Sequence, residues 1–147
     1  MLFRSVNAGG DLRVFGSVRH TLALRIPAAP SASIGVAELQ DLSCATSGGY
    51  FKADANVNVN VNVNASAKAD AKAMMLSRHP AIIGKRSRSM RAVASVSVVA
   101  PSCAVADALT KVVWLRGIND PMCVDLLARY SARVVMFNAA GLIVSQC

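Results

Sequence analysis

A carboxylate and a hydroxyl lie three residues apart in CAVADALTKVVWLRG, residues 103 to 117, a stretch that is otherwise largely apolar. If this stretch is a helix, Asp107 and Thr110 project from the same face and their oxygen atoms can converge on one point. Two hard oxygen donors suit Mg²⁺, which uses few protein ligands and completes its octahedron with water and substrate phosphates. The spacing alone leaves a second interpretation open, a carboxylate near a helix N-terminus that interacts favourably with the helix dipole.

Lys111 lies on the same helical face, four residues after Asp107. Its ammonium group could pair with Asp107, meet a phosphate, or reach solvent from a helix that is otherwise buried. The face therefore offers a carboxylate, a hydroxyl and an ammonium group within about one helical turn.

Local signals predict the elements that hold this face in place. VASVSVVAP (93–101) is rich in β-branched residues and alternates, which predicts a strand. Pro101 and Ser102 then stop the strand and cap a helix from Cys103 to Leu115, with Gly117 at its C-terminal end.

A second helix is predicted from about Pro121 to Ala132, because Asp120 is a good N-cap and proline is favoured at the first helical position. RVVMFNAAGLIVSQC (133–147) predicts two strands joined by Asn-Ala-Ala-Gly. We expect an α+β fold, with a mixed or antiparallel sheet, two C-terminal helices and a terminal hairpin.

The N-terminal part is predicted to be strands. DLRVFG (11–16) and TLALRI (21–26) flank a Gly-Ser turn, as in a hairpin, and Pro27 and Pro30 follow it. VAELQDLSCATSGGY (36–50) predicts a further single strand that ends in a glycine turn. The chain is expected to be one domain, 1–147, with a low-complexity insert at about 53–72 that contains a Val-Asn repeat.

Composition limits the classes of function. The hydrophobic content of 54% is typical of a folded chain, and the net charge of +8 favours a polyanionic partner such as nucleic acid, nucleotide or phospholipid. The four cysteines, Cys44, Cys103, Cys123 and Cys147, are widely spaced and predict buried thiols rather than a zinc site.

No export or membrane segment is expected from the sequence. The N-terminal residues MLFRSVNAGG lack the apolar region of a secretory signal. Pro101, Asp107 and Lys111 interrupt the most apolar window, from about Ala92 to Leu115, which argues against a transmembrane segment. The chain as encoded is therefore expected in the cytoplasm.

RHPAIIGKRSRSMR (78–91) contains five basic residues and no acid. It is interpreted either as a loop that faces phosphate or as a solvated basic loop. No aromatic residue lies among the basic ones, which weakens a role in binding single-stranded nucleic acid by stacking.

Three blocks in order, NAGGDLRVFG (7–16), ATSGGY (45–50) and SVSVVAPSCAVADALTKVV (95–113), resemble the C-terminal half of the ApbE family, the FAD:protein FMN transferases. The resemblance implies a Mg²⁺-dependent enzyme that cleaves FAD, releases AMP and attaches FMN through a phosphoester to a threonine or serine of an acceptor flavoprotein subunit. FAD and this acceptor would be its partners, and nucleic acid is not expected to be one.

The resemblance also implies site residues. Asp107 matches a metal ligand of the family, and the ligand one turn later falls on Thr110. Many members have threonine at the next position, where this chain has Lys111. The stretch from His79 matches a flavin-contacting segment and places Ile83 near the cofactor, although Gly84 and Lys85 replace an expected Asp-Pro pair.

Family members are longer and are often periplasmic and membrane-anchored, so the chain is expected to be an incomplete domain that is inactive alone. No catalytic residue is assigned. The alternative function is a basic module that binds nucleic acid or nucleotide without catalysis, through residues 78–91.

Overall fold

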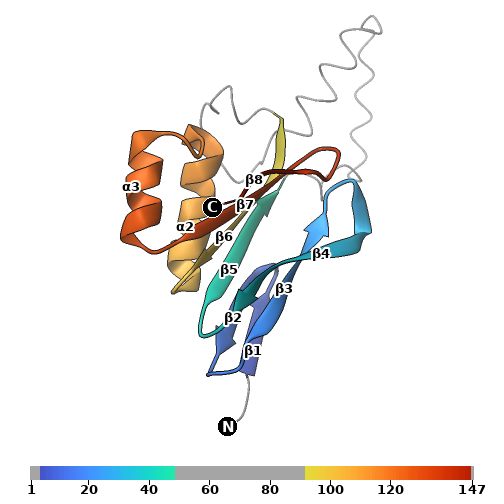
Figure 1. Cartoon of the computed structure of the whole chain (residues 1–147), viewed down its shortest axis with the longest axis vertical. Coiled ribbons are helices and arrows are strands. Elements are labelled where there is room, and N and C mark those ends of the chain that lie inside the picture. The colour runs from blue at the N-terminus through green and yellow to red at the C-terminus, as the bar shows by residue number, and fades with distance from the viewer. Residues whose placement is uncertain (1–3, 49–91, 147) are drawn as a thin grey trace, which may run out of the picture.

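The structure is a computed structural model that describes residues 4–48 and 92–146. These residues form an α+β fold in which every strand pairing is antiparallel, as the fold class predicted. Two helices cover one face of a six-stranded sheet, and a two-stranded ribbon covers the other face (Figure 1).

The large sheet has the strand order β1-β2-β5-β6-β7-β8. Its strands are β1 (Arg4–Ala8), β2 (Asp11–Phe15), β5 (Ser43–Gly48), β6 (Val93–Ala100), β7 (Arg133–Asn138) and β8 (Ile143–Gln146). The ribbon consists of β3 (His20–Ile26) and β4 (Ala29–Leu39), and the helices are α2 (Cys103–Arg116) and α3 (Pro121–Arg129). Among the described residues, no helix has the length and hydropathy needed to cross a membrane.

Strand alternation divides the core into two layers. Val96 and Val98 of β6 face the helices and join the cluster around Trp114 of α2. Val99 of the same strand faces the other way, into the cluster under the β3–β4 ribbon, together with Phe137 of β7. Because both faces of β6 are covered, all eight of its residues are buried, which explains its nearly continuous apolar sequence.

The predicted C-terminal half is confirmed. The strand predicted over 93–101 is β6, and the helix predicted from Cys103 to Leu115 is α2, one residue longer. The helix predicted from Pro121 to Ala132 is α3, which ends three residues earlier at Arg129. The terminal strands β7 and β8 pair as a hairpin, as expected from the Asn-Ala-Ala-Gly connection.

Two predictions for the N-terminal half are wrong. The segments 11–16 and 21–26 do not form a hairpin with each other, because β2 pairs with β1 and β5 while β3 pairs with β4 in the separate ribbon. Residues 36–50 are not one strand either: β4 ends at Leu39, and β5 begins at Ser43 in the large sheet. The chain changes sheets at Asp41, which has a φ of 50°.

The cysteines in the described ranges are largely buried, as expected: Cys44 and Cys123 are buried and Cys103 is half-buried. Burial raises the pKa of the Cys44 thiol to about 12, and the charges of Asp11 and Cys103 add to this shift. Cys147 and the insert at about 53–72 lie outside the described residues.

Candidate functional site

Helix α2 carries the candidate residues, and its first turn is fixed by the segment that follows β6. The Ser102 hydroxyl accepts a hydrogen bond from the Val105 N–H at 3.4 Å, and its carbonyl accepts from the Ala106 N–H at 3.0 Å. At the other end, the Gly117 N–H donates to the Val113 carbonyl at 2.9 Å. These caps satisfy backbone groups that a helix end leaves open, and they fix where Asp107 lies along the sheet.

Thr110 faces the sheet rather than solvent. Its side chain is fully buried, and its hydroxyl donates to the Asp107 carbonyl at 2.7 Å. The Ser47 hydroxyl of β5 lies 2.7 Å from the same oxygen. Since the one Thr110 proton is used on Asp107, Ser47 is the donor in this second bond. The arrangement fastens α2 to β5 through a buried polar contact.

Asp107 and Lys111 form an ion pair on the more open side of α2. The Lys111 ammonium group contacts Oδ1 of Asp107, and the two side chains remain 34% and 44% exposed, respectively. Burial lowers the pKa of Lys111, and the negative charge of Asp11 opposes this effect. The pairing of Lys111 with Asp107, one of three options that the sequence left open, is the one observed.

Asp11 joins this charge cluster from a different strand. It begins β2, directly after a turn in which Gly9 and Gly10 have φ values of 66° and 109°. The Asn7 side-chain oxygen accepts a hydrogen bond from the Gly10 N–H at 3.1 Å, which closes the turn. A charge contribution from Asp11 to Lys111 was not predicted. The one sequence signal for a role of Asp11 is that this acidic residue directly follows a glycine turn.

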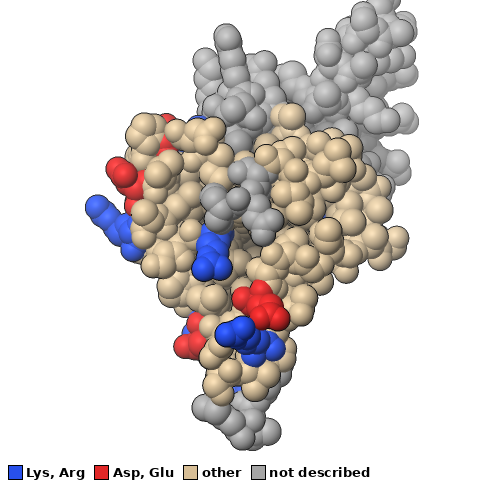
Figure 2. Space-filling view, in the orientation of Figure 1, with Lys and Arg blue, Asp and Glu red and all other residues tan. Residues whose placement is uncertain are grey.

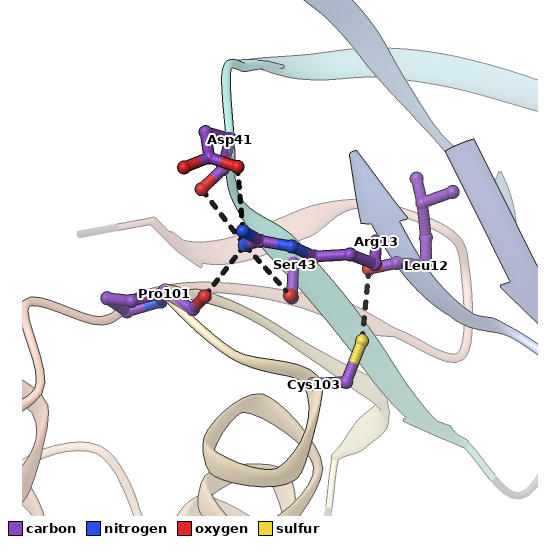
Figure 3. A network of polar contacts seen from close by, with 6 residues as sticks. All are labelled: Leu12, Arg13, Asp41, Ser43, Pro101 and Cys103. Carbon is purple, nitrogen blue, oxygen red and sulfur yellow. Dashed lines mark hydrogen bonds and ion pairs between the residues drawn. The ribbon is translucent and has the colours of Figure 1, made fainter. Parts of the chain in front are cut away.

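Arg13 joins the segments around the start of α2 (Figure 3). Its guanidinium donates to the Pro101 carbonyl at 2.7 Å, and to the carbonyl and carboxylate of Asp41 at 2.9 and 2.7 Å. A weaker contact, at 3.5 Å, reaches the Ser43 hydroxyl. The rigid fork of donors connects β2, the turn before β5 and the turn before α2. The sequence analysis did not single out Arg13, because its partners are distant in the chain.

A cavity of about 330 Å³ opens beside Lys111 on the outer side of α2. It is lined by Lys111, Val112, Leu115, Arg116 and Met122. Arg116 is paired with Asp120, with 3.0 Å between Nε and Oδ1. The cavity therefore combines an apolar wall with two basic side chains that already have acidic partners.

In this arrangement the predicted metal ligands do not fit a divalent cation. Oδ1 of Asp107 is bound to an ammonium group, and the Thr110 hydroxyl is directed to β5 and to its own helix. Within residues 4–48 and 92–146, no three His, Cys, Asp or Glu side chains gather as metal ligands would. Mg²⁺ binding by Asp107 and Thr110 stays a prediction, and the observed contacts do not support it.

Most of the excess positive charge lies outside the described residues. Residues 4–48 and 92–146 hold eight Lys and Arg and six Asp and Glu, so only +2 of the net +8 belongs to them. On the face in Figure 2, the described basic side chains are scattered, and several lie beside acidic ones. The basic stretch 78–91 and Ile83 fall outside the described ranges, so both predictions about them stay predictions.

One family model matches most of the described chain. The model of the ApbE family matches residues 4–129. No curated protein matches the chain significantly. A solved structure, the flavin transferase ApbE from Vibrio cholerae, is similar, with 20% sequence identity and a TM-score of 0.49. The match covers 97% of this chain and 41% of that one, so the chain spans about two fifths of that protein's length.

Proposed function

Because this chain belongs to the ApbE family, we propose that it acts in flavin transfer, with FAD as the substrate and a threonine or serine of an acceptor protein as the recipient of FMN. The family match over residues 4–129 is the observation that carries the proposal. The matched range includes the turn before Asp11, the Arg13 contacts next to α2, and the charged face of α2.

The proposed reaction is a phosphoryl transfer. The acceptor hydroxyl oxygen forms a bond to the phosphorus of the FMN half, and the bond from that phosphorus to the bridging pyrophosphate oxygen breaks. AMP leaves with the electron pair, and the hydroxyl proton passes to solvent. Such a reaction depends mainly on alignment of the reacting groups and on neutralisation of phosphate charge.

The described residues support the positioning part of this proposal. Helix α2 is held at two points, because Arg13 bonds the turn before it and the Ser47–Thr110 contact bonds its middle. Lys111 brings a half-buried ammonium group to the edge of the apolar cavity, where a phosphate oxygen of a nucleotide could meet it. No described residue is assigned the proton of the acceptor hydroxyl.

The resemblance implies that the reaction uses Mg²⁺ at Asp107 and Thr110. Since the contacts of these two residues do not fit a divalent cation, the proposal routes no step through a metal. Contact of Ile83 with the flavin remains part of the proposal as a prediction. The alternative of a nucleic-acid-binding module depends on residues 78–91, and nothing in the described residues favours it.

Equilibrium dialysis of the folded chain against FAD and riboflavin tests the proposal. A site that recognises the nucleotide should bind FAD at least about tenfold more tightly than riboflavin, which has no phosphate. Lys111→Met should weaken FAD binding and leave riboflavin binding unchanged. Arg129→Met is the matched control, because it removes one positive charge at an exposed position away from the cavity and should change neither.

Burial of Trp114, the single tryptophan, provides the check that each variant is folded, since its fluorescence reports the packing of α2. Equal affinities of the folded chain for FAD and riboflavin would contradict the proposal.

A further inference from the structure

The ion pair on α2 joins the carboxylate that the resemblance assigns to a metal and a lysine of the same helix. Lys111 follows Asp107 by four residues, so both side chains emerge from one face and meet without any change in the backbone. Both are half-buried, which limits the water available to separate them.

A divalent cation at Asp107 would have to compete with this ammonium group. Mg²⁺ requires near-octahedral oxygen coordination, and the neighbouring Thr110 hydroxyl oxygen is buried and already accepts a hydrogen bond from Ser47. A cation on Asp107 would therefore gain one carboxylate from α2 and would lie next to a positive charge.

The electrostatic repulsion between the Lys111 ammonium group and a divalent cation determines whether the cation can bind at Asp107. Two positive charges about 4 Å apart repel even at the dielectric constant of water, and the effect doubles for a divalent ion. The repulsion corresponds to at least about a tenfold loss of cation affinity while Lys111 stays in place.

We propose that the ammonium group of Lys111 takes the place of a divalent cation at Asp107, so that α2 of this chain does not hold Mg²⁺. The carboxylate of Asp107 is neutralised by a positive charge that belongs to the helix itself. A chain in which residue 111 is uncharged then leaves the Asp107 carboxylate without its cationic partner, and a divalent cation can bind there.

Binding of Mn²⁺, followed by the electron paramagnetic resonance signal of the free ion, tests the inference without any nucleotide. Lys111→Met keeps the length of the apolar stem and removes the charge, and should bind Mn²⁺ at least about tenfold more tightly than the native chain. The gain should disappear in the double variant Lys111→Met with Asp107→Asn. Lys111→Gln provides a second neutral side chain in case the methionine variant does not fold.

Arg116→Met is the matched control. It also removes a positive charge from α2 that is paired with an acid four residues away, but Asp120 then still accepts the N–H groups of Met122 and Cys123. This variant should bind Mn²⁺ as the native chain does.

Three results would overturn the inference: unchanged Mn²⁺ affinity in both neutral variants of Lys111, a gain that survives Asp107→Asn, or an equal gain in the arginine control. Because the assay contains no FAD, none of them bears on the proposed flavin transfer.

Discussion

Replacement of Thr110 by valine tests whether this residue holds α2 against β5 through a buried hydrogen bond. Valine has nearly the same shape as threonine, so the change removes the hydroxyl and keeps the branched side chain at this position. The Ser47 hydroxyl, only 2% exposed, then loses the partner that lies 2.7 Å away. An unsatisfied buried hydroxyl costs about 1–3 kcal/mol, so Thr110→Val should lower the free energy of unfolding by that amount.

The partner substitution separates the contact from other effects. Ser47→Ala should cost less, about 0.5–1.5 kcal/mol, because Thr110 still donates to the Asp107 carbonyl. The double variant removes both hydroxyls and leaves no unsatisfied group. The double variant should therefore lose about 1 kcal/mol less free energy of unfolding than the sum of the losses in the two single variants.

Urea unfolding followed by Trp114 fluorescence and by circular dichroism measures these differences. With a slope of about 2 kcal/mol per molar urea, in the middle of the typical range, Thr110→Val should lower the midpoint by about 0.5–1.5 M. Thr21→Val is the control, because it makes the same chemical change at an exposed position of β3 and should stay within about 0.5 kcal/mol of the native chain. A native midpoint for Thr110→Val, or strictly additive losses in the double variant, would refute the assignment.

Three further predictions concern the surroundings of α2. Arg13→Lys keeps the charge but loses the fork that bonds Pro101 and Asp41, so the free energy of unfolding should fall by about 1–3 kcal/mol; an unchanged melting temperature would contradict this. Since burial raises the pKa of Cys44 to about 12, its thiol in the folded chain should resist alkylation at pH 9, where the unfolded chain reacts. Equal rates of Cys44 labelling with and without urea, measured by mass spectrometry, would argue against that burial. Hydrogen bonds from Arg116 and from the start of α3 lower the pKa of Asp120 in the folded state, so its stabilisation is present above about pH 4 and is lost as the pH falls below it. Asp120→Asn should remove this part of the acid sensitivity in urea midpoints at pH 7 and pH 3, and a native pH dependence in this variant would show that another group causes it.

The elements predicted correctly are those whose signals lie within a few residues. Ser102 caps α2 through the N–H of Val105, and Asp120 caps α3 through the next residues along the chain. The valine-rich strand β6 and the terminal hairpin also depend on local composition and turn residues. Local chemistry sets these boundaries, so a single sequence is sufficient to find them.

The wrong predictions concern the N-terminal strands, where pairing is decided by distant contacts. Nothing near β2 in the sequence indicates that its partner after β1 is β5 rather than β3. The break between β4 and β5 has no glycine or proline. It depends instead on Asp41 at a φ of 50°, which Arg13 holds from 28 residues away.

The sequence predicted that the candidate residues of α2 lie within one helical turn, but it did not predict their contacts. Helical spacing predicted Asp107, Thr110 and Lys111 on one face, but in the structure Thr110 faces the sheet while Asp107 and Lys111 pair on the more open side of α2. The direction of the Thr110 hydroxyl depends on Ser47, which is 63 residues earlier in the chain. The choice of partner for Lys111 depends on charge and burial around α2, including Asp11 from β2. Spacing on a helix identifies candidate ligands, and the neighbouring strand decides whether they are available.

The most direct test of the account is the dissociation constant of FAD for the native chain and for Lys111→Met, each measured in EDTA and in excess Mg²⁺. If Lys111 supplies the positive charge at this site, the native chain should bind FAD with affinities that differ less than about twofold between the two conditions. Lys111→Met should bind FAD more weakly in EDTA and recover affinity with Mg²⁺. Binding of FAD by the native chain only in the presence of Mg²⁺ would contradict the role of Lys111, and no saturable FAD binding by the folded chain would contradict the proposed function itself.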